Sequence, residues 1–109
     1  MIELPINNQP NQFFRTSIPM ADRNLPLNFH IYWNTIAEYW QMTIQDALTG
    51  IEYINGLPLL PGESPAQLLL RQWGYFDIGN ALVLAISNTA GERPVLGDWG
   101  VNFILVWGE

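Results

Sequence analysis

The sequence predicts a mainly β fold, built as a small antiparallel β-sandwich or a partly open β-barrel with one short helix at about residues 65–73. Two observations lead to this fold class. Apolar and polar residues alternate strictly from 25 to 33, which is typical of a strand with one buried face. Breaks rich in proline, glycine and asparagine separate several further strand-length segments. The chain has 109 residues, a usual size for one domain, so we expect residues 1–109 to form a single unit.

The first strands are expected at residues 2–6 and 12–18. A polar stretch separates them, and the prolines at their boundaries, Pro5, Pro10 and Pro19, suit strand ends or sheet edges because proline cannot donate to a ladder. These two segments therefore lie at the margins of the predicted sheets.

A three-stranded meander is expected next. The strand at 25–33 is followed by a second alternating segment at 38–46, and four connecting residues are a normal length for an antiparallel hairpin. A third strand is expected at 51–54, with a turn at Asn55 and Gly56, which tolerate positive φ.

The last third begins with the predicted helix. Ser64 and Pro65 match an N-cap followed by proline at the first helical position, and Gly74 suits the C-terminal end. Two strands follow at 81–86, which is apolar on both faces, and at 101–107, which is nearly so, with Asn102 as its only polar side chain. Such strands need cover on two sides, from a second sheet and the helix or from another subunit.

Composition excludes several classes of function. Apolar residues make up 49% and charged residues 13%, about half the ~25% of an ordinary domain, and there is no lysine. The net charge of −6 opposes binding to phosphate backbones, so we expect no specific nucleic-acid binding. The absence of cysteine excludes disulfides and thiol chemistry. The N-terminus has no signal-peptide pattern, and the longest apolar run has strand length, so we expect no membrane anchor.

No catalytic or metal-binding constellation is expected. His30 is the only histidine and lies on the polar side of its strand, which favours a solvated or structural role. The ten carboxylates are scattered, mostly at turns and strand ends, although a hydrolase built on two converging carboxylates stays a minor alternative. The sequence therefore predicts no catalytic residues, no metal, no cofactor and no enzymatic activity.

The aromatic residues support two interpretations. Trp33 and Trp40 are expected on inward faces, Tyr32 and Tyr39 on outward faces, and Trp99 exposed in a loop. If three or more of these five lined one exposed groove, a carbohydrate-binding β module would be favoured. Exposed aromatics among uncharged polar neighbours also describe a permanent protein interface, where charge is depleted, and this is the more economical interpretation.

The order of motifs resembles a known family. Residues 9–14, Gln-Pro-Asn-Gln-Phe-Phe, 29–34, Phe-His-Ile-Tyr-Trp-Asn, and 40–46, Trp-Gln-Met-Thr-Ile-Gln-Asp, are similar to the small plug proteins of phage tail baseplates, best known from a contractile-tailed cyanophage. Residues 56–62, Gly-Leu-Pro-Leu-Leu-Pro-Gly, and 96–100, Leu-Gly-Asp-Trp-Gly, also match, so the resemblance covers nearly the full length.

The resemblance implies a structural protein of the virion, made in the host cytoplasm and located in the tail baseplate. Such plugs close the central channel between the tail tube and the hub and spike, contact both, and act as oligomers, for which cyclic symmetry is expected. The partner interface is expected at the aromatics least accounted for by the core and at their neighbours: Phe13, Phe14, Arg15, Tyr32, Tyr39, Asp98 and Trp99.

Overall fold

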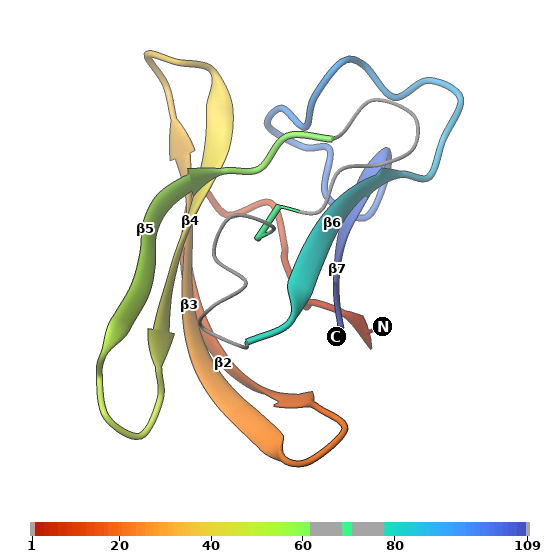
Figure 1. Cartoon of the computed structure of the whole chain (residues 1–109). Helices are drawn as coiled ribbons and strands as arrows, with labels where there is room; N and C mark the ends of the chain where they lie inside the picture. The colour runs from red at the N-terminus through yellow and green to blue at the C-terminus, as the bar shows by residue number, and fades with distance from the viewer. Residues whose placement is uncertain (1, 62–68, 71–77, 109) are drawn as a thin grey trace.

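The computed structural model describes residues 2–61, 69–70 and 78–108, which form seven strands (Figure 1). No helix occurs among these described residues, and so none that is long and apolar enough to cross a membrane. The strands are β1 (Ile2–Glu3), β2 (Asn11–Pro19), β3 (Asn24–Asn34), β4 (Tyr39–Asp46), β5 (Glu52–Pro58), β6 (Asn80–Ala85) and β7 (Phe103–Gly108).

The strands form two antiparallel sheets that face each other. The larger has the order β2-β3-β4-β5, and the smaller has the order β1-β7-β6. Figure 1 shows the two sheets as separate layers, with the small sheet in cyan, blue and red beside the large one. The sheets are not closed into a barrel, so of the two predicted architectures the β-sandwich is confirmed.

The core fills the space between the sheets because each strand of the hairpin alternates as predicted. In β3 the buried residues are Leu25, Leu27, Phe29 and Ile31, and β4 adds Trp40, Met42 and Ile44. The small sheet contributes Ala81, Val83, Phe103, Leu105 and Trp107. Full burial of one large apolar side chain stabilises the fold by about 1.5–3 kcal/mol. The register of the hairpin is therefore strongly determined by this face.

Trp107 connects the two layers. Its ring packs edge-on against Phe29 of the large sheet, with centroids 5.3 Å apart, and its Nε1 donates a hydrogen bond of 2.9 Å to the carbonyl oxygen of Ile78. The buried indole thus has its polar atom satisfied, as a core tryptophan requires.

Two predicted boundaries in the first half are wrong. The first strand ends at Glu3 and not at residue 6, because Leu4 turns the chain: its N–H donates to Leu105 and its carbonyl oxygen accepts from Ile6. The turn predicted at Asn55 and Gly56 is instead a β-bulge within β5, where the register against β4 shifts. Gly56 has a φ of +71°, so the glycine signal was correct but marked a bulge.

The last third follows the prediction in part. Strand β6 nearly coincides with the expected 81–86, whereas β7 begins at Phe103, because the carbonyl oxygen of Asp98 accepts from the N–H groups of residues 101–103 in a tight turn. On the second face of these strands Leu82 and Leu84 are half-buried. The helix expected at 65–73 lies mostly outside the described residues; Leu69 and Leu70, which are described, lie in a turn.

Candidate partner interface

Over β2, β3 and β4 the large sheet carries a nearly uncharged surface on the side turned away from the core, which we call the outer face; Glu52 of β5 lies beside Gln45 at its margin. The outer face consists of the outward side chains of β2, β3 and β4: Asn11, Phe13, Arg15, Ser17, Asn28, His30, Tyr32, Asn34, Tyr39, Gln41, Thr43 and Gln45. Arg15 is the only charged side chain of this set. Aromatic rings among amides and hydroxyls, with little charge, are the composition typical of the centre of a protein interface.

Three rings form a row across the outer face. Phe13 stacks on His30 with centroids 4.0 Å apart and planes 9° from parallel, and the His30 ring lies 4.7 Å from Tyr32. Phe13 nevertheless leaves 71% of its surface exposed. Partial burial lowers the pKa of His30 below its ordinary value, which favours the neutral ring at pH 7. The row is thus an uncharged strip of aromatic rings on the outer face.

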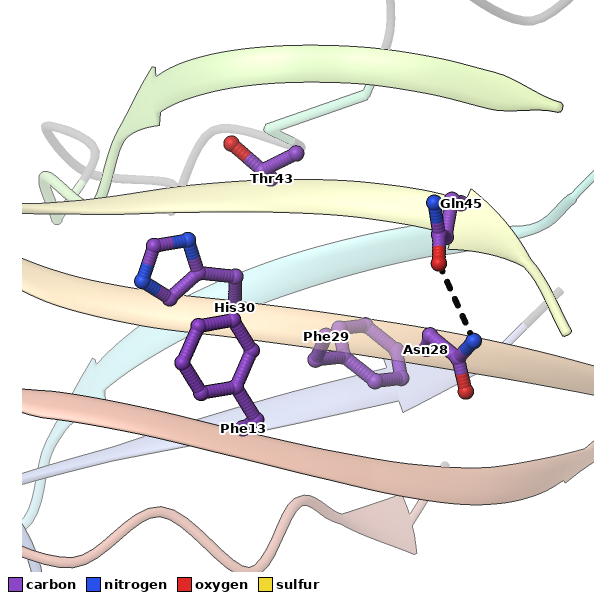
Figure 2. A pocket seen from close by; sticks show the side chains of 6 residues that line it. All are labelled: Phe13, Asn28, Phe29, His30, Thr43 and Gln45. Carbon is purple, nitrogen blue, oxygen red and sulfur yellow. Dashed lines mark hydrogen bonds between the residues drawn. The ribbon is translucent and has the colours of Figure 1, made fainter. Parts of the chain in front are cut away.

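A pocket of about 200 Å³ opens beside this row (Figure 2). Its lining comes from three neighbouring strands: Phe13, Asn28, Phe29, His30, Thr43 and Gln45. Figure 2 shows the Asn28 amide pointing toward Gln45, to which it donates a 3.1 Å hydrogen bond. The pocket is smaller than the roughly 300–1,000 Å³ of ordinary ligand sites and has no carboxylate in its lining. Its size suits one inserted side chain of a partner.

Hydrogen bonds hold the other half of the outer face in place. Asn34 donates to Gln41 Oε1 at 3.0 Å, and Gln41 Nε2 donates to the carbonyl oxygen of Gly56 at 3.0 Å. A Cβ atom at Gly56 would lie 3.3 Å from both the Tyr32 hydroxyl and Gln41 Nε2. The missing side chain therefore leaves room for Tyr32 to lie across the bulge.

Four of the seven predicted interface residues lie together on the outer face. Phe13 and Arg15 come from β2, and Tyr32 and Tyr39 come from the β3–β4 hairpin. Arg15 is exposed and donates to Asn28 Oδ1 at 3.2 Å and to the carbonyl oxygen of Ala47 at 3.0 Å.

Phe14 does not belong to the outer face. It is half-buried, packs against the core and stacks on Phe29 with centroids 5.0 Å apart. Successive side chains of a strand alternate between its two faces, so Phe13 and Phe14 point in opposite directions.

The expectation that Trp99 is exposed is wrong. Its side chain is 3% exposed and packs edge-on against Trp40, with centroids 6.1 Å apart. Asn8 holds the backbone of Trp99 from both sides, because its Oδ1 accepts from the Trp99 N–H and its Nδ2 donates to the Trp99 carbonyl oxygen, each at 3.0 Å. Two segments far away in the chain, Trp40 against its ring and Asn8 against its backbone, hold this tryptophan in the core, and no local pattern indicates them.

Asp98 stabilises its own loop. One carboxylate oxygen accepts from the Val95 N–H and the other from Asn102 Nδ2, both at 2.9 Å. These bonds explain an acidic residue at this position without a partner protein.

A second surface was missed by sequence reasoning. Five exposed apolar side chains, which we call the apolar end, occupy the β3–β4 turn and the loops before β7: Ile36, Ile86, Val95, Leu96 and Val101. Ile36 is 97% exposed. Hydrogen bonds from Arg93 to the Ala37 carbonyl and from Trp40 Nε1 to the Val95 carbonyl hold the turn and the loop together. Ile36, Val95 and Leu96 lie in predicted turns or loops and were the signal for this patch, because such segments usually carry polar side chains. Ile86 and Val101 were predicted to lie in strands.

The described residues contain no group of three or more histidine and acidic side chains that could hold a metal ion. Asp46 illustrates the local use of the carboxylates: the N–H of Thr49, and then that of Leu48, lower its pKa by hydrogen bonding to it. This is a turn-forming aspartate, as its place at the end of a strand predicted.

The five aromatics that would define a sugar-binding groove do not come together on one exposed surface. Trp40 and Trp99 are buried, and Trp33 packs against the core with its ring 5.7 Å from that of Trp40. Only Tyr32 and Tyr39 lie on the outer face. The carbohydrate-binding alternative therefore lacks the groove on which it depended.

Comparison with known proteins agrees with the resemblance found in the motifs. The family described as "Cyanophage baseplate Pam3 plug gp18" matches residues 1–109, which is the whole chain. A search of curated proteins gives no match. The fold is all-β over the described residues. The chain belongs to the cyanophage baseplate plug family, a family of structural components of the phage tail baseplate.

Proposed function

We propose that this protein closes the central channel of a tail baseplate, between the tail tube on one side and the hub and spike on the other, and contacts both. The single observation that carries the proposal is the family match over all 109 residues. The proposal includes no catalytic step, and its location is the virion after synthesis in the host cytoplasm.

The outer face supports a role in assembly. Its centre consists of rings and amides with Arg15 as its one charge, and burying such a surface avoids most of the desolvation penalty that charged groups carry. The hydrogen bonds among Asn28, Gln45, Asn34 and Gln41 fix these side chains before a partner arrives. Less side-chain entropy is then lost on association.

The apolar end supplies a second contact surface. Its members are exposed in the isolated chain and lie in a turn and loops, of which the β3–β4 turn and the 93–95 loop are joined by hydrogen bonds; exposed apolar side chains of this kind mark interaction sites. A channel plug needs two contacts, one toward the tube and one toward the hub. The outer face and the apolar end are two surfaces of different chemistry that adjoin at the β3–β4 turn, where Ile36 lies between Asn34 and Tyr39.

Identical copies around the tail axis would form a closed cyclic oligomer, because closed symmetry is the usual arrangement of identical subunits. The interface residues proposed for these contacts are Phe13, Arg15, Tyr32 and Tyr39 on the outer face. Asp98 and Trp99 act through the shape of the loop that they hold.

Deletion of the gene tests the proposed function. We expect infected cells to accumulate normal heads but no closed, infectious tails, because the channel lacks its plug. Electron microscopy of lysates and the titre of infectious particles measure the two quantities. A deletion strain with a normal titre would overturn the proposal.

A further inference from the structure

Strand β2 is an edge strand whose outer side is open. It is nine residues long and pairs only with β3. The hydrogen bonds from Trp33 to Pro10 and from Met20 to Arg23 fix the phase of this ladder. Antiparallel pairing then alternates along β2, so even-numbered residues bond to β3 and the N–H and C=O groups of Asn11, Phe13, Arg15 and Ser17 point outward. Within the described part of the chain these groups have no hydrogen-bond partner.

The opposite edge of the same sheet is protected. Strand β5 carries the bulge at Asn55 and Gly56, and also Pro58, which has no N–H to donate. These are the devices by which proteins prevent edge-to-edge pairing. Strand β2 has prolines only at its ends, Pro10 before it and Pro19 as its last residue, and keeps a regular register from Asn11 to Pro19. This contrast indicates that the β5 edge is protected from pairing with another strand, whereas the β2 edge is available for it.

The side chains along the open edge define what would pair with it. Phe13 is 71% exposed, and Arg15 is the only charged residue of the strand. The Arg15 guanidinium bonds to the amide oxygen of Asn28 and the carbonyl of Ala47, and in the described residues no carboxylate pairs with it. The β2 strand of a second copy is a poor occupant, because each β2 brings an arginine and no acid, so pairing two of them would leave both arginines without a carboxylate.

We propose that β2 is completed by an extended segment of another tail protein, which adds a fifth strand to the large sheet and carries an acidic residue and, two positions away, an apolar one. The acidic side chain lies opposite Arg15 and the apolar one opposite Phe13, since cross-strand neighbours on one face repeat every second residue. Main-chain hydrogen bonds to the outward groups of β2 supply the attachment. This inference rests on the proposed function, because it names one of the contacts of the plug.

Proline substitution tests the backbone pairing directly. In Ser17→Pro the lost N–H points outward, so the ladder with β3 stays intact, as for natural prolines on edge strands. We expect the variant to unfold within a few degrees of the wild type but to be retained in purified tails at least about tenfold less, because lost edge hydrogen bonds weaken the attachment. Ser17→Ala, which keeps the N–H, is the matched control and is expected to assemble normally.

Normal retention of a folded Ser17→Pro protein would overturn the inference. Hydrogen exchange of the β2 segment gives a second measurement that does not depend on the variant: we expect greater protection in tails than in the isolated chain, and equal protection would also overturn it. Arg15→Glu is expected to reduce retention more than Arg15→Gln, and the reverse order would contradict an acidic partner.

Sedimentation of the isolated chain tests the alternative occupant. We expect a monomer at micromolar concentration; a dimer that Ser17→Pro abolishes would assign the edge to a second copy and overturn the partner proposed here. The gene deletion separates the two proposals. If deletion blocks tail assembly and Ser17→Pro does not, the proposed function as a channel plug is supported and only the edge pairing is contradicted. If deletion leaves tail assembly normal, both proposals are contradicted.

Discussion

Single side chains determine the geometry of the loops around the large sheet. Gln12 is the clearest case: it is 7% exposed, its Nε2 donates to the carbonyl oxygens of Asn7 and Gln9 at 2.8 and 3.0 Å, and its Oε1 accepts from the Asn7 N–H at 3.0 Å. Asn8 in the same turn holds Trp99. The polar stretch at residues 7–12, which in the sequence has the composition of a simple linker, is therefore an ordered turn that joins the start of β2 to the loop around Trp99.

Replacement of Gln12 tests this ordered turn. Gln12→Ala leaves the Asn7 N–H and two carbonyl oxygens without their partner, so we expect a loss of about 2–3 kcal/mol in the free energy of unfolding. Gln9→Ala, at an exposed position in the same turn, is expected to change it by less than about 0.5 kcal/mol. Urea unfolding measures both, and equal effects would contradict a specific role for Gln12.

The histidine in the aromatic row predicts a pH dependence. Partial burial lowers the pKa of His30 from 6.5, so the unfolded chain takes up this proton before the folded chain does. Stability is then fully present above about pH 6.5 and is lost as the pH falls from 6.5 through the folded pKa. Urea unfolding between pH 7 and 5 is expected to show a steeper loss for the wild type than for His30→Gln. If the free energy of unfolding falls equally with pH in the two proteins, His30 is not the cause of the pH dependence.

At the scale of elements, the sequence predicted strands well where one face is buried. The alternation in β3 and β4 determined both segments and their pairing, because a shift by one residue would turn Phe29, Ile31 and Trp40 toward solvent. The prediction from sequence failed where a contact between residues far apart in the chain decides the local conformation. The bulge at Gly56 depends on pairing with β4, and the buried Trp99 packs against Trp40, so no local signal distinguishes them from a turn and an exposed loop.

The bulge gives a prediction about β5. Gly56 has a φ of +71° and close neighbours, whereas Gly50 has a φ of +77° with nothing near its missing Cβ. Gly50→Ala therefore measures backbone strain alone, about 1 kcal/mol, and Gly56→Ala adds the displacement of Tyr32 and Gln41. We expect the larger loss of stability at Gly56. Equal losses in urea unfolding would show that the contact with Tyr32 is unimportant.

At the scale of the whole molecule, the shortage of charge has two origins. Part of the apolar excess fills the core between the sheets, and part remains exposed at the apolar end, where Ile36, Leu96 and Val101 each leave more than half of their surface open. The candidate site was predictable where outward positions of regular strands build it, as for Phe13, Tyr32 and Tyr39. The apolar end was not predictable in this way, because it is built from loops that only the folded structure brings close together.

Lysine substitutions test the two surfaces separately. Ile36 is 97% exposed, so Ile36→Lys is expected to leave the thermal unfolding temperature almost unchanged while it reduces incorporation into tails at least about tenfold, because a charge would be buried at the contact. Leu48→Lys, at a 79% exposed turn position outside both surfaces, is the control. The double variant Tyr32→Lys and Tyr39→Lys probes the outer face in the same way. If either surface variant is incorporated into tails normally, that surface is not a contact of the protein in the baseplate.

Cryo-electron microscopy of the intact tail shows where in the baseplate this protein lies. We expect density for the sandwich on the tail axis, between the last ring of the tube and the hub, with the outer face and the apolar end covered by neighbouring chains. Density for the chain only at the periphery of the baseplate, or an open channel with this chain absent from infectious particles, would contradict it.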